Sequence, residues 1–569
     1  MDFRQNTAII YSEETRKILI DKALAEGKVY RFDGAEGKKS WLVGKYAYLA
    51  ANALSNILRR LGISFDVLSE NEIRDDILEF YDTVFLPNAA HLSESALSLI
   101  YKWCGDNNHK LIVSGDTNLP DLFLGVGHRK RVVASDYCGI PEFVFCPPDY
   151  TMNFCLKNGK AQGFEKVVSF QKNNQAWEME KTDYDAIIIN QNVLYVTFSV
   201  FEYFGALFQG HLDIKPIYEI LPSKRCFYLD LATIFLKKLF KKIGIKESCK
   251  IEIDSVDLRK NIMILKHDVD YSRNLEYLKF ELENHIPATF AILVDKNKDF
   301  WLSNIPENDF IEKSYHFPAN LRGKLNNITH ILKLDFNKIL TIKKNLYHQV
   351  KSAKNHGIPI NTIHRHGSKF YYPETVDGLG YLYRQLPEIK GSMTMFRFSN
   401  FQFSKSEFSK NYTIEHPDVS VPFWFPFKLK EASIESKEEI RGWEMGQFIE
   451  PDIKHINSVF DSSRSLPGIF SFDFHPAHAK TDTFNPGGNF KWFEYAVKRA
   501  RENHWLILNY RDVCQRLDER ENLKIRRERD KISIYNSGDE PICKINIVVD
   551  NKRYFINEIE PNQILHYGE

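Results

Sequence analysis

The sequence lacks the cysteine patterns of secreted domains and of small metal-binding domains. Its eight cysteines are scattered, and none forms a C-x-x-C pair or the dense spacing of a disulfide framework. The first 17 residues, MDFRQNTAIIYSEETRK, also lack the basic segment and apolar run of a secretory signal. Together these absences predict reduced thiols and a cytoplasmic protein.

Long apolar runs and an excess of one charge are missing as well. The longest stretch of aromatic and aliphatic residues, 194–208, is interrupted by Glu202. It is shorter than the roughly 20 residues that cross a bilayer, so no transmembrane segment is expected. The 76 Lys and Arg residues nearly balance 75 Asp and Glu residues, for a formal net charge of +1. Without a global positive field, nucleic acid is not expected as a partner.

The chain does contain enough length and apolar content for several folded cores. Its 569 residues, 43% of them hydrophobic, exceed the size of one compact domain. In residues 1–125, strand signals alternate with helix signals, which predicts a parallel, doubly wound sheet. We expect strands at 7–11, 63–68, 83–86 and 110–114, and helices at 44–61 and after Ser93.

The rest of the chain divides by composition and periodicity. A helical connector is followed by a second region of alternating strands and helices, and the chain ends in short alternating strands around Asn-Ser-Gly and Asp-Asn turns. The charge-dense run 516–531 is interpreted as a solvated joint. The sequence therefore predicts an α/β protein with a doubly wound domain (1–215), a helical connector (216–254), a second α/β domain (255–515) and a small β domain (516–569).

Two carboxylates follow the first strand of the second α/β domain. The segment KHDVD at 266–270 ends this strand, and a helix and another strand come after it. Active-site residues collect at such strand ends, because the strand fixes them and the loops shape a pocket. Asp268 and Asp270 therefore suit a proton acceptor and a hard metal ligand. The alternative is a solvated turn with an aspartate that caps the helix.

Histidines follow two further strands of the same domain. His364 and His366 lie two residues apart on an extended segment, so one strand can offer both imidazoles to a metal; an ordinary surface loop is the alternative. His475 ends a strand in which three phenylalanines alternate with Ile, Ser and Asp, and Pro476 stops that strand. This position favours a general acid, and a structural histidine bonded to a carbonyl is the alternative.

In chain order, these segments resemble the motifs of the polysaccharide deacetylases of carbohydrate esterase family 4. The segments are KHDVD at 266–270, HRHG at 364–367 and FHP at 474–476, with ATF at 288–290 on the strand between. The first is similar to a divergent branch in which HDVD replaces the commoner TFDDG. The resemblance covers residues 255–515 and implies a distorted (β/α) barrel with a bound divalent metal, usually zinc.

The resemblance also implies roles for individual residues. Carried over by position, Asp268 is the base, His475 is the acid and Arg365 orients the base. In such a site the metal activates water, the base takes its proton and the acid protonates the departing amine.

The metal ligands implied by the resemblance are one aspartate and two histidines. Asp270 is the aspartate, and we favour His364 and His366 as the histidines. Many relatives take both histidines from a glycine-rich motif that this chain does not have. His316 and His330 are therefore kept in reserve, and loss of the site is the alternative.

The N-terminal region resembles the class I glutamine amidotransferase fold, which occurs as an accessory domain beside sugar-active enzymes. The resemblance rests on FLPNAAHLS at 85–93 and LIVSGDT at 111–117. An active amidotransferase needs a cysteine on a sharp, glycine-flanked turn, and the sequence contains no G-x-C-x-G. Cys104 lies in an expected helix and Cys138 lacks the preceding glycine, so we expect a non-catalytic lobe.

Aromatic loops near the expected site are candidates for stacking on sugar rings. The residues expected to contact substrate are Tyr371, Tyr372, Trp424 and His478, the last with a smaller effect than His475.

Together, the motifs predict a zinc-dependent hydrolase that removes an N-acetyl group from an amino sugar of a glycan or glycan precursor. The alternative is a catalytically silent carbohydrate-binding or assembly protein that keeps a degenerate barrel. Hydrolysis of a glycosidic bond by Asp268 and another carboxylate is disfavoured by the histidines. The sugar, the metal, the role of the N-terminal lobe and the oligomeric state stay open.

Overall fold

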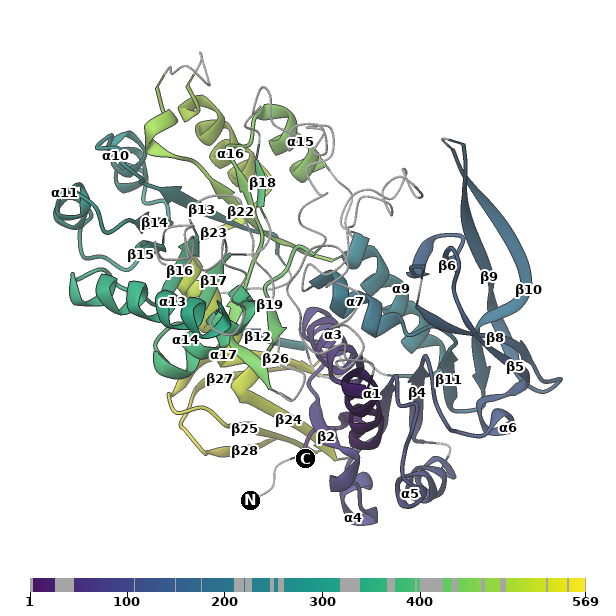
Figure 1. Ribbon diagram of the computed structural model, residues 1–569. Coiled ribbons are helices and arrows are strands. Elements are labelled where there is room, and N and C mark those ends of the chain that lie inside the picture. The colour runs from purple at the N-terminus through teal and green to yellow at the C-terminus, as the bar shows by residue number, and fades with distance from the viewer. Residues whose placement is uncertain are drawn as a thin grey trace. The chain divides into compact units, whose positions relative to one another are not determined.

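The computed structural model of the chain divides into two units (Figure 1). Unit 1 comprises residues 1–224, 231–254 and 519–569, and unit 2 comprises residues 225–230 and 255–518. Both units combine sheets with helices, which confirms the expected α/β class. The domain limits expected at 215, 254 and 515 stay predictions. The structure describes residues 4–25, 46–106, 108–148, 150–174, 176–208, 220, 228–245, 250–253, 260–317, 338–365, 374–394, 397–399, 423–431, 438–461, 466–480, 488–528, 531–549 and 552–567.

Unit 1 contains the parallel sheet expected from the first part of the sequence. Its strands lie in the order β2-β1-β3-β4-β11, each parallel to its neighbour. Ser93 caps the helix α5 by accepting a hydrogen bond from the backbone N–H of Ala96, as expected. The bounds are β1 Thr7–Tyr11, β2 Asp66–Ser69, β3 Thr83–Pro87, β4 Lys110–Ser114, β11 Val193–Val196, α1 Glu13–Ala25, α3 Tyr46–Leu61, α4 Asp75–Leu78, α5 Glu94–Cys104, α7 Val200–Phe208 and α9 Tyr228–Lys242.

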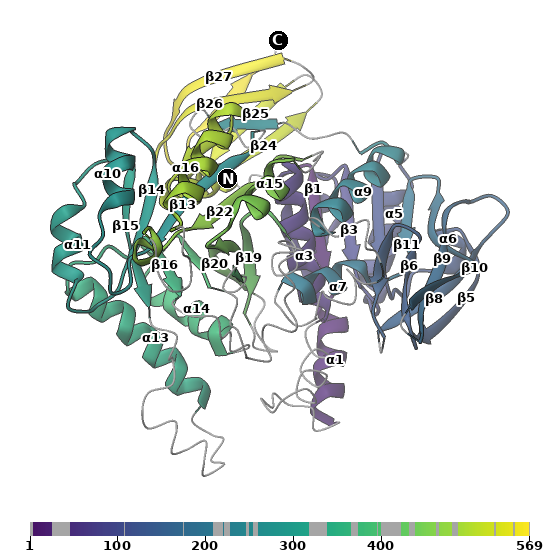
Figure 2. The ribbon, with the colours of Figure 1, turned by 90° about the horizontal axis from the view of Figure 1, so that it is seen from above.

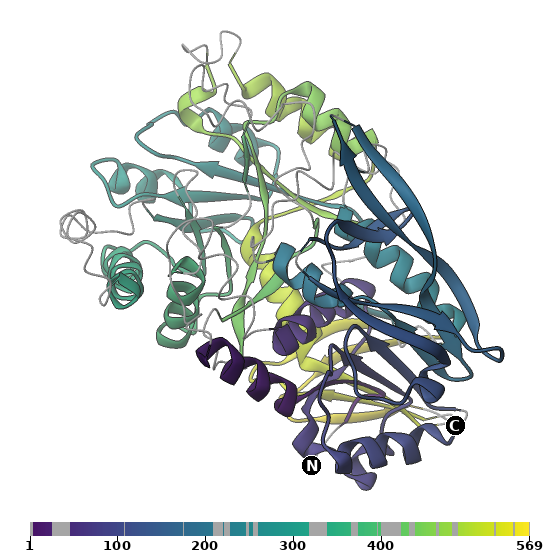
Figure 3. The same ribbon diagram turned by 45° about the vertical axis from the view of Figure 1, so that its right-hand side comes forward.

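Antiparallel strands continue this sheet beyond β11. The two longest, β9 (Gln162–Asn173) and β10 (Ala176–Asn190), form a long ribbon (Figure 3). The other members are β5 Val126–Val133, β6 Tyr137–Ile140, β7 Phe143–Cys146 and β8 Thr151–Lys157, and the short helix α6 (Asp121–Leu124) precedes them.

Two three-stranded sheets of unit 1 share one apolar core. The interpretation of 516–531 as a solvated joint is wrong, because β24 lies within it. Leu523 and Ile525 are buried, and charged residues alternate with them. This alternation of buried and charged side chains with a period of two is typical of a β-strand. The sheets have the orders β24-β25-β28 and β12-β26-β27, with β12 Lys250–Ile253, β24 Leu523–Glu528, β25 Lys531–Asn536, β26 Ile542–Val549, β27 Lys552–Ile559 and β28 Ile564–Tyr567.

Unit 2 is built on a second, mainly parallel sheet. Its order is β18-β21-β22-β13-β14-β15-β16-β17-β20-β19, and β23 also pairs with β13. Among the described residues no pairing joins β19 to β18, so closure into a barrel stays a prediction. The bounds are β13 Ile262–Asp268, β14 Ala288–Ile292, β15 Ile311–Phe317, β16 Thr362–Arg365, β17 Gly391–Met393, β18 Arg397–Ser399, β19 Phe427–Lys430, β20 Glu439–Glu444, β21 Gln447–Ile449, β22 Ile469–Asp473 and β23 Leu506–Leu508.

Helices cover one face of these strands, and polar side chains occupy the other. Helices α10, α11 and α13 lie beside β14 to β16 (Figure 2). Phe474 packs at 5.7 Å from Phe493 of α16, whereas Ser471 and Asp473 point to the opposite face. The helices are α10 Glu276–Glu283, α11 Lys298–Asn304, α13 Lys338–Asn355, α14 Glu374–Gln385, α15 Ile453–Asp461, α16 Phe490–Glu502 and α17 Tyr510–Asn522. In the described parts of the chain, no helix has both the length and the apolar character needed to cross a membrane.

Candidate metal and catalytic site

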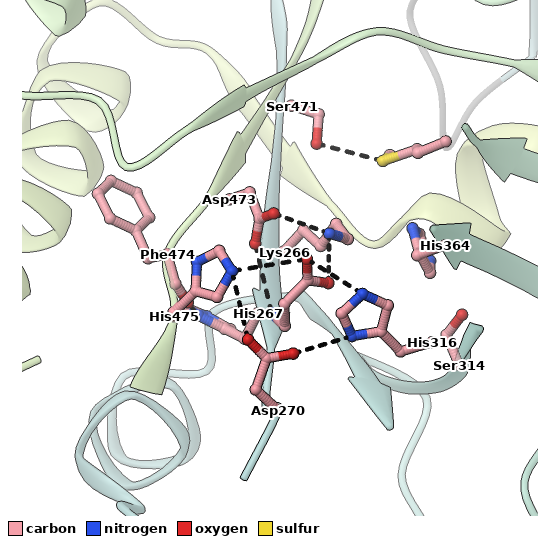
Figure 4. A network of polar contacts seen from close by, with 12 residues as sticks. Lys266, His267, Asp270, Ser314, His316, His364, Ser471, Asp473, Phe474 and His475 are labelled. Atoms are coloured by element: carbon pink, nitrogen blue, oxygen red, sulfur yellow. Dashed lines mark hydrogen bonds and ion pairs between the residues drawn. The ribbon is translucent and has the colours of Figure 1, made fainter. Parts of the chain in front are cut away.

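The carboxyl ends of β13, β15 and β22 bring two carboxylates and two imidazoles together (Figure 4). The Nδ1 atom of His316 lies 3.4 Å from Oδ1 of Asp270, and its Nε2 atom lies 3.5 Å from Oδ2 of Asp268. The Nε2 atom of His475 lies 3.7 Å from Oδ2 of Asp270 and 3.8 Å from Oδ2 of Asp268. Four side chains from three strand ends therefore face one another.

The spacing of these donor atoms suits one metal ion. Ligand atoms at 2.0 to 2.2 Å from a tetrahedral zinc lie about 3.3 to 3.6 Å from one another. The distance from Oδ1 of Asp270 to Nδ1 of His316 falls in this interval, and that from Oδ2 of Asp270 to Nε2 of His475 lies just beyond it. Oδ2 of Asp268 faces the other nitrogen of His316, Nε2, and one imidazole binds a given ion through a single nitrogen. All four carboxylate–imidazole distances exceed the lengths of good hydrogen bonds. Asp270 and one nitrogen of His316 therefore fit a shared divalent metal.

Asp270 reaches the site through an unusual backbone conformation. Its φ angle is 42°, in the left-handed region that few residues other than glycine adopt, although aspartate tolerates it better than most. The strand β13 ends two residues earlier, at Asp268. The left-handed turn brings the Asp270 carboxylate back to the strand end, and 17% of this side chain is exposed.

A buried lysine, Lys266, lies between the carboxylates of Asp268 and Asp473. Nζ of Lys266 is 2.5 Å from Oδ1 of Asp268 and 2.9 Å from Oδ2 of Asp473. Side-chain exposure is at most 2% for these three residues. Burial, and then the charge of Asp268, raise the pKa of Asp473 to about 6, although Lys266 opposes this. Lys266 thus provides the positive charge beside both acids.

Glu450 holds the imidazole of His475 from the outer side. Its Oε1 accepts hydrogen bonds from the backbone N–H of His475 at 2.6 Å and from Nδ1 of the same residue at 2.8 Å. Nδ1 of His478 lies 3.2 Å from this oxygen, and Asn489 donates to the other one. Because Nδ1 of His475 is engaged, its Nε2 faces Asp268 and Asp270.

The charges around His475 set its protonation. Burial alone lowers the pKa of His475, but Asp473 and Glu450 raise it to about 10. Burial likewise acts to raise the pKa of Glu450, yet the hydrogen bonds from His475 and His478 bring it below its usual range. The pair is therefore an ionised carboxylate with a protonated imidazole.

Two triplets of described residues, neither of which contains Asp270 or His316, have donor atoms close enough for one ion. They are Asp268, Asp473 and His475, and Glu450, His475 and His478. In the first, Lys266 already lies against both carboxylates. In the second, hydrogen bonds join Glu450 to both imidazoles. We therefore favour the set that contains Asp270 and His316.

The predicted residues that meet here are Asp268, Asp270 and His475, together with the reserve ligand His316. His364 lies opposite His316 in the register of β15 and β16, and its Nε2 is 3.3 Å from Oγ1 of Thr362 (Figure 4). Its role as a ligand stays a prediction.

The structure also describes the predicted residues Arg365 and Trp424. Arg365 is the last residue of β16 and is buried. Its role in orienting the base stays a prediction. Trp424 is 1% exposed and packs against Phe448 at 4.5 Å and Phe470 at 4.8 Å, which places its ring in the core. Those outside the described residues are His330, His366, Tyr371 and Tyr372.

The sequence interpretation assigned no role to Lys266, Asp473 or Glu450. For Lys266 and Asp473, the sequence did contain a local pattern that could have found them. Lys266 precedes Asp268 by two residues on one strand, and Asp473 precedes His475 in the same way, so each pair was bound to share a face. Glu450 had no local signal, because its partners lie about 25 residues later in the chain.

No protein-family model matches the sequence, and no curated protein matches it. Among solved structures, α-L-fucosidase isoenzyme 2 from Paenibacillus thiaminolyticus is similar at 10% identity, with a TM-score of 0.28 over 45% of this chain, which spans only 35% of the fucosidase. A Bordetella bronchiseptica protein described as a polysaccharide deacetylase involved in O-antigen biosynthesis is similar at 13% identity, with a TM-score of 0.22 over 44% of this chain and 86% of that one. Both scores are too low to establish a shared fold.

Proposed function

We propose that this chain is a metal-dependent amide hydrolase that removes an N-acetyl group from an amino sugar of a glycan or glycan precursor. The observation that carries the proposal is that Asp270 and His316 lie at a spacing that suits one shared ion, with Asp268 and His475 beside them. The resemblance of the HDVD segment to the deacetylases supplies the reaction class.

Asp270 and His316 are the residues that would hold the metal, for which zinc is the best match to an oxygen and nitrogen donor set. His364 and His366 remain the further predicted ligands. When bound, the metal supplies a water of lowered pKa and polarises the amide carbonyl. Oδ2 of Asp268 faces the two imidazoles, so this carboxylate is placed to take a proton from the attacking water.

His475 is the acid of the proposed reaction. Glu450 holds its Nδ1, so Nε2 points to the site and can give its proton to the amide nitrogen as the carbon–nitrogen bond breaks. The water oxygen forms the new bond to the acetyl carbon. The products are acetate and the free amine of the sugar, with His478, Tyr371 and Tyr372 as proposed substrate contacts.

The N-terminal lobe takes no chemical part in this proposal. Burial raises the pKa of both Cys104 and Cys138 to about 12, so each thiol stays protonated and is a poor nucleophile at neutral pH. This supports a scaffold or substrate-holding role, and glutamine is not expected to release ammonia.

A second candidate is a catalytically silent carbohydrate-binding protein. The observation that favours it is Lys266, whose ammonium already lies against two of the carboxylates at the strand ends without a metal.

Metal analysis and an acetate-release assay separate the two candidates. Protein without a histidine tag is purified, loaded with zinc, dialysed, and assayed with chito-oligosaccharides and UDP-N-acetylglucosamine. The deacetylase proposal expects about one zinc per chain and acetate release that a chelator abolishes. Protein that retains no zinc and releases no acetate, yet binds the same sugars, would establish the silent candidate.

A further inference from the structure

Lys266 and Asp268 share one face of β13 because they are two residues apart on a strand. The lysine side chain is fully buried, and its Nζ lies 2.5 Å from Oδ1 of Asp268. The other oxygen, Oδ2, is the one that faces His316 and His475. The two oxygens of this carboxylate therefore have different neighbours.

The same ammonium also lies 2.9 Å from Oδ2 of Asp473. Asp268 and Asp473 with His475 otherwise form a triplet whose donor atoms lie close enough for one ion. A positive charge between the two carboxylates repels a divalent cation from this inner position. It also engages the oxygen atoms that such a cation would need.

We propose that Lys266 is a positioning residue that keeps Asp268 out of the metal's ligand set, so that this carboxylate serves as the base. The inference rests on the proposed function and deepens it. The ammonium confines the metal to the outer donors, Asp270 and His316, and leaves Oδ2 of Asp268 directed at the place where water is activated.

A lysine on a strand is well suited to holding the Asp268 carboxylate in place. Its charge is compact, and it can donate up to three hydrogen bonds from one nitrogen. A buried charge also needs partners to be stable, and the two carboxylates supply them. The two contacts of the ammonium therefore hold both carboxylates beside it.

The experiment compares wild-type protein with Lys266→Met, which keeps the length of the side chain and removes the charge. Apo protein is titrated with zinc against a chromophoric chelator, and the absorption spectrum of the cobalt(II) form reports the ligands. We expect zinc to bind about tenfold or more tightly, the cobalt spectrum to change as Asp268 becomes a ligand, and kcat for the acetylated sugar to fall about 10² to 10³-fold.

The double variant Lys266→Met with Asp473→Asn keeps the test valid if the single variant does not fold. It leaves one fewer unpaired buried carboxylate. If Lys266 only neutralised Asp473, the double variant would recover the wild-type rate and zinc affinity. The proposal expects low kcat and tight zinc binding to persist, because Asp268 is still released.

A matched control is Lys430→Met. Lys430 is also buried, on β19 of the same sheet, and its Nζ contacts the carbonyl oxygen of Glu431 at 3.2 Å. Zinc affinity, the cobalt spectrum and kcat should stay within about twofold of wild type in this variant.

The outcomes for Lys266 and for the proposed function are distinguishable. Wild-type zinc affinity and cobalt spectra in both Lys266 variants would overturn the inference while the wild-type deacetylase activity stands. Wild-type protein that binds no zinc, beside a Lys266→Met variant that does, would support exclusion by the lysine and overturn the proposed function. Absence of zinc binding in both would overturn both.

Discussion

The two 11-stranded sheets of this chain differ in the polar side chains that follow their parallel strands. In unit 2, the strand ends carry carboxylates that face imidazoles at 3.4 to 3.8 Å. In unit 1, the polar group after β3 is Asn88, which donates a hydrogen bond at 2.7 Å to Oε2 of the buried Glu202 on α7. Burial raises the pKa of Glu202 well above its usual range.

Another acid of unit 1, Asp116, is paired with neighbouring side chains. Asp116, just beyond β4, pairs with Arg131 at 2.6 Å and accepts a hydrogen bond from Asn153 at 3.1 Å. Such groups stabilise a fold but offer no base, acid or ligand set. The comparison teaches that position at a strand end is not enough; the partners decide whether a carboxylate is reactive.

The largest expected effect comes from removing the metal-binding carboxylate of unit 2. Asp270→Asn keeps a residue that tolerates the left-handed φ of 42° and removes the charge. We expect zinc to be lost and deacetylation to fall about 10³-fold or more, because a metal contributes several kcal/mol and about 1.4 kcal/mol is tenfold in rate. Zinc content and acetate release measure both.

The matched control for this variant is Asp299→Asn, whose side chain is 86% exposed. It should keep zinc and activity. An Asp270→Asn protein with full zinc content and the wild-type rate would remove Asp270 from the site.

The next effect concerns the proposed acid. His475→Ala should lower kcat by roughly 10² to 10⁴ while bound zinc stays, since loss of a general acid slows proton transfer without removing a ligand. Loss of zinc in this variant would make His475 a ligand instead. Activity equal to wild type would end its catalytic role.

Glu450→Gln should have a smaller effect. The amide can still contact Nδ1 of His475, but the Glu450 charge, which with that of Asp473 raises the pKa of the imidazole, is gone. Residues that orient a ligand or catalytic group typically contribute 10 to 100-fold, so we expect kcat to fall about that much with zinc content unchanged. A variant with unchanged kcat would show that the backbone alone holds His475.

The smallest effect on activity is expected in unit 1, where Glu202→Gln should leave deacetylation unchanged and alter stability. Glu202 keeps its proton in the folded state above the pH at which the unfolded chain loses it. Stability from this group is therefore fully present below about pH 4.5 and falls as pH rises, by up to about 1.4 kcal/mol per pH unit.

Glutamine cannot ionise, so the gain of Glu202→Gln over wild type should increase from pH 5 to pH 8. Urea unfolding at several pH values measures this difference. The exposed Glu142→Gln serves as the control and should give a difference that is independent of pH. A constant difference for Glu202→Gln as well would show that the buried carboxyl is not protonated in the folded protein.

Short-range periodicity predicted a large part of the fold. The strands at β3 and β4, the cap at Ser93 and the strand β22, which ends two residues before His475, all follow from residues within a few positions of one another. Residues 126–215 were harder to interpret, apart from the strands expected at 186–189 and 195–198, because the long antiparallel ribbon of β9 and β10 is largely exposed and so has little apolar alternation. That His316 would lie 3.4 Å from Asp270 was also beyond local pattern.

The sequence by itself determined the α/β class, the strand that carries Asp268 and the end of the strand that carries His475. These depend on the alternation of side chains within one element, which a few neighbouring residues decide. Only the tertiary structure decided that Lys266 engages one oxygen of Asp268 and that Glu450 holds His475. Such contacts depend on the order and register of strands far apart in the chain, and no local period encodes that order.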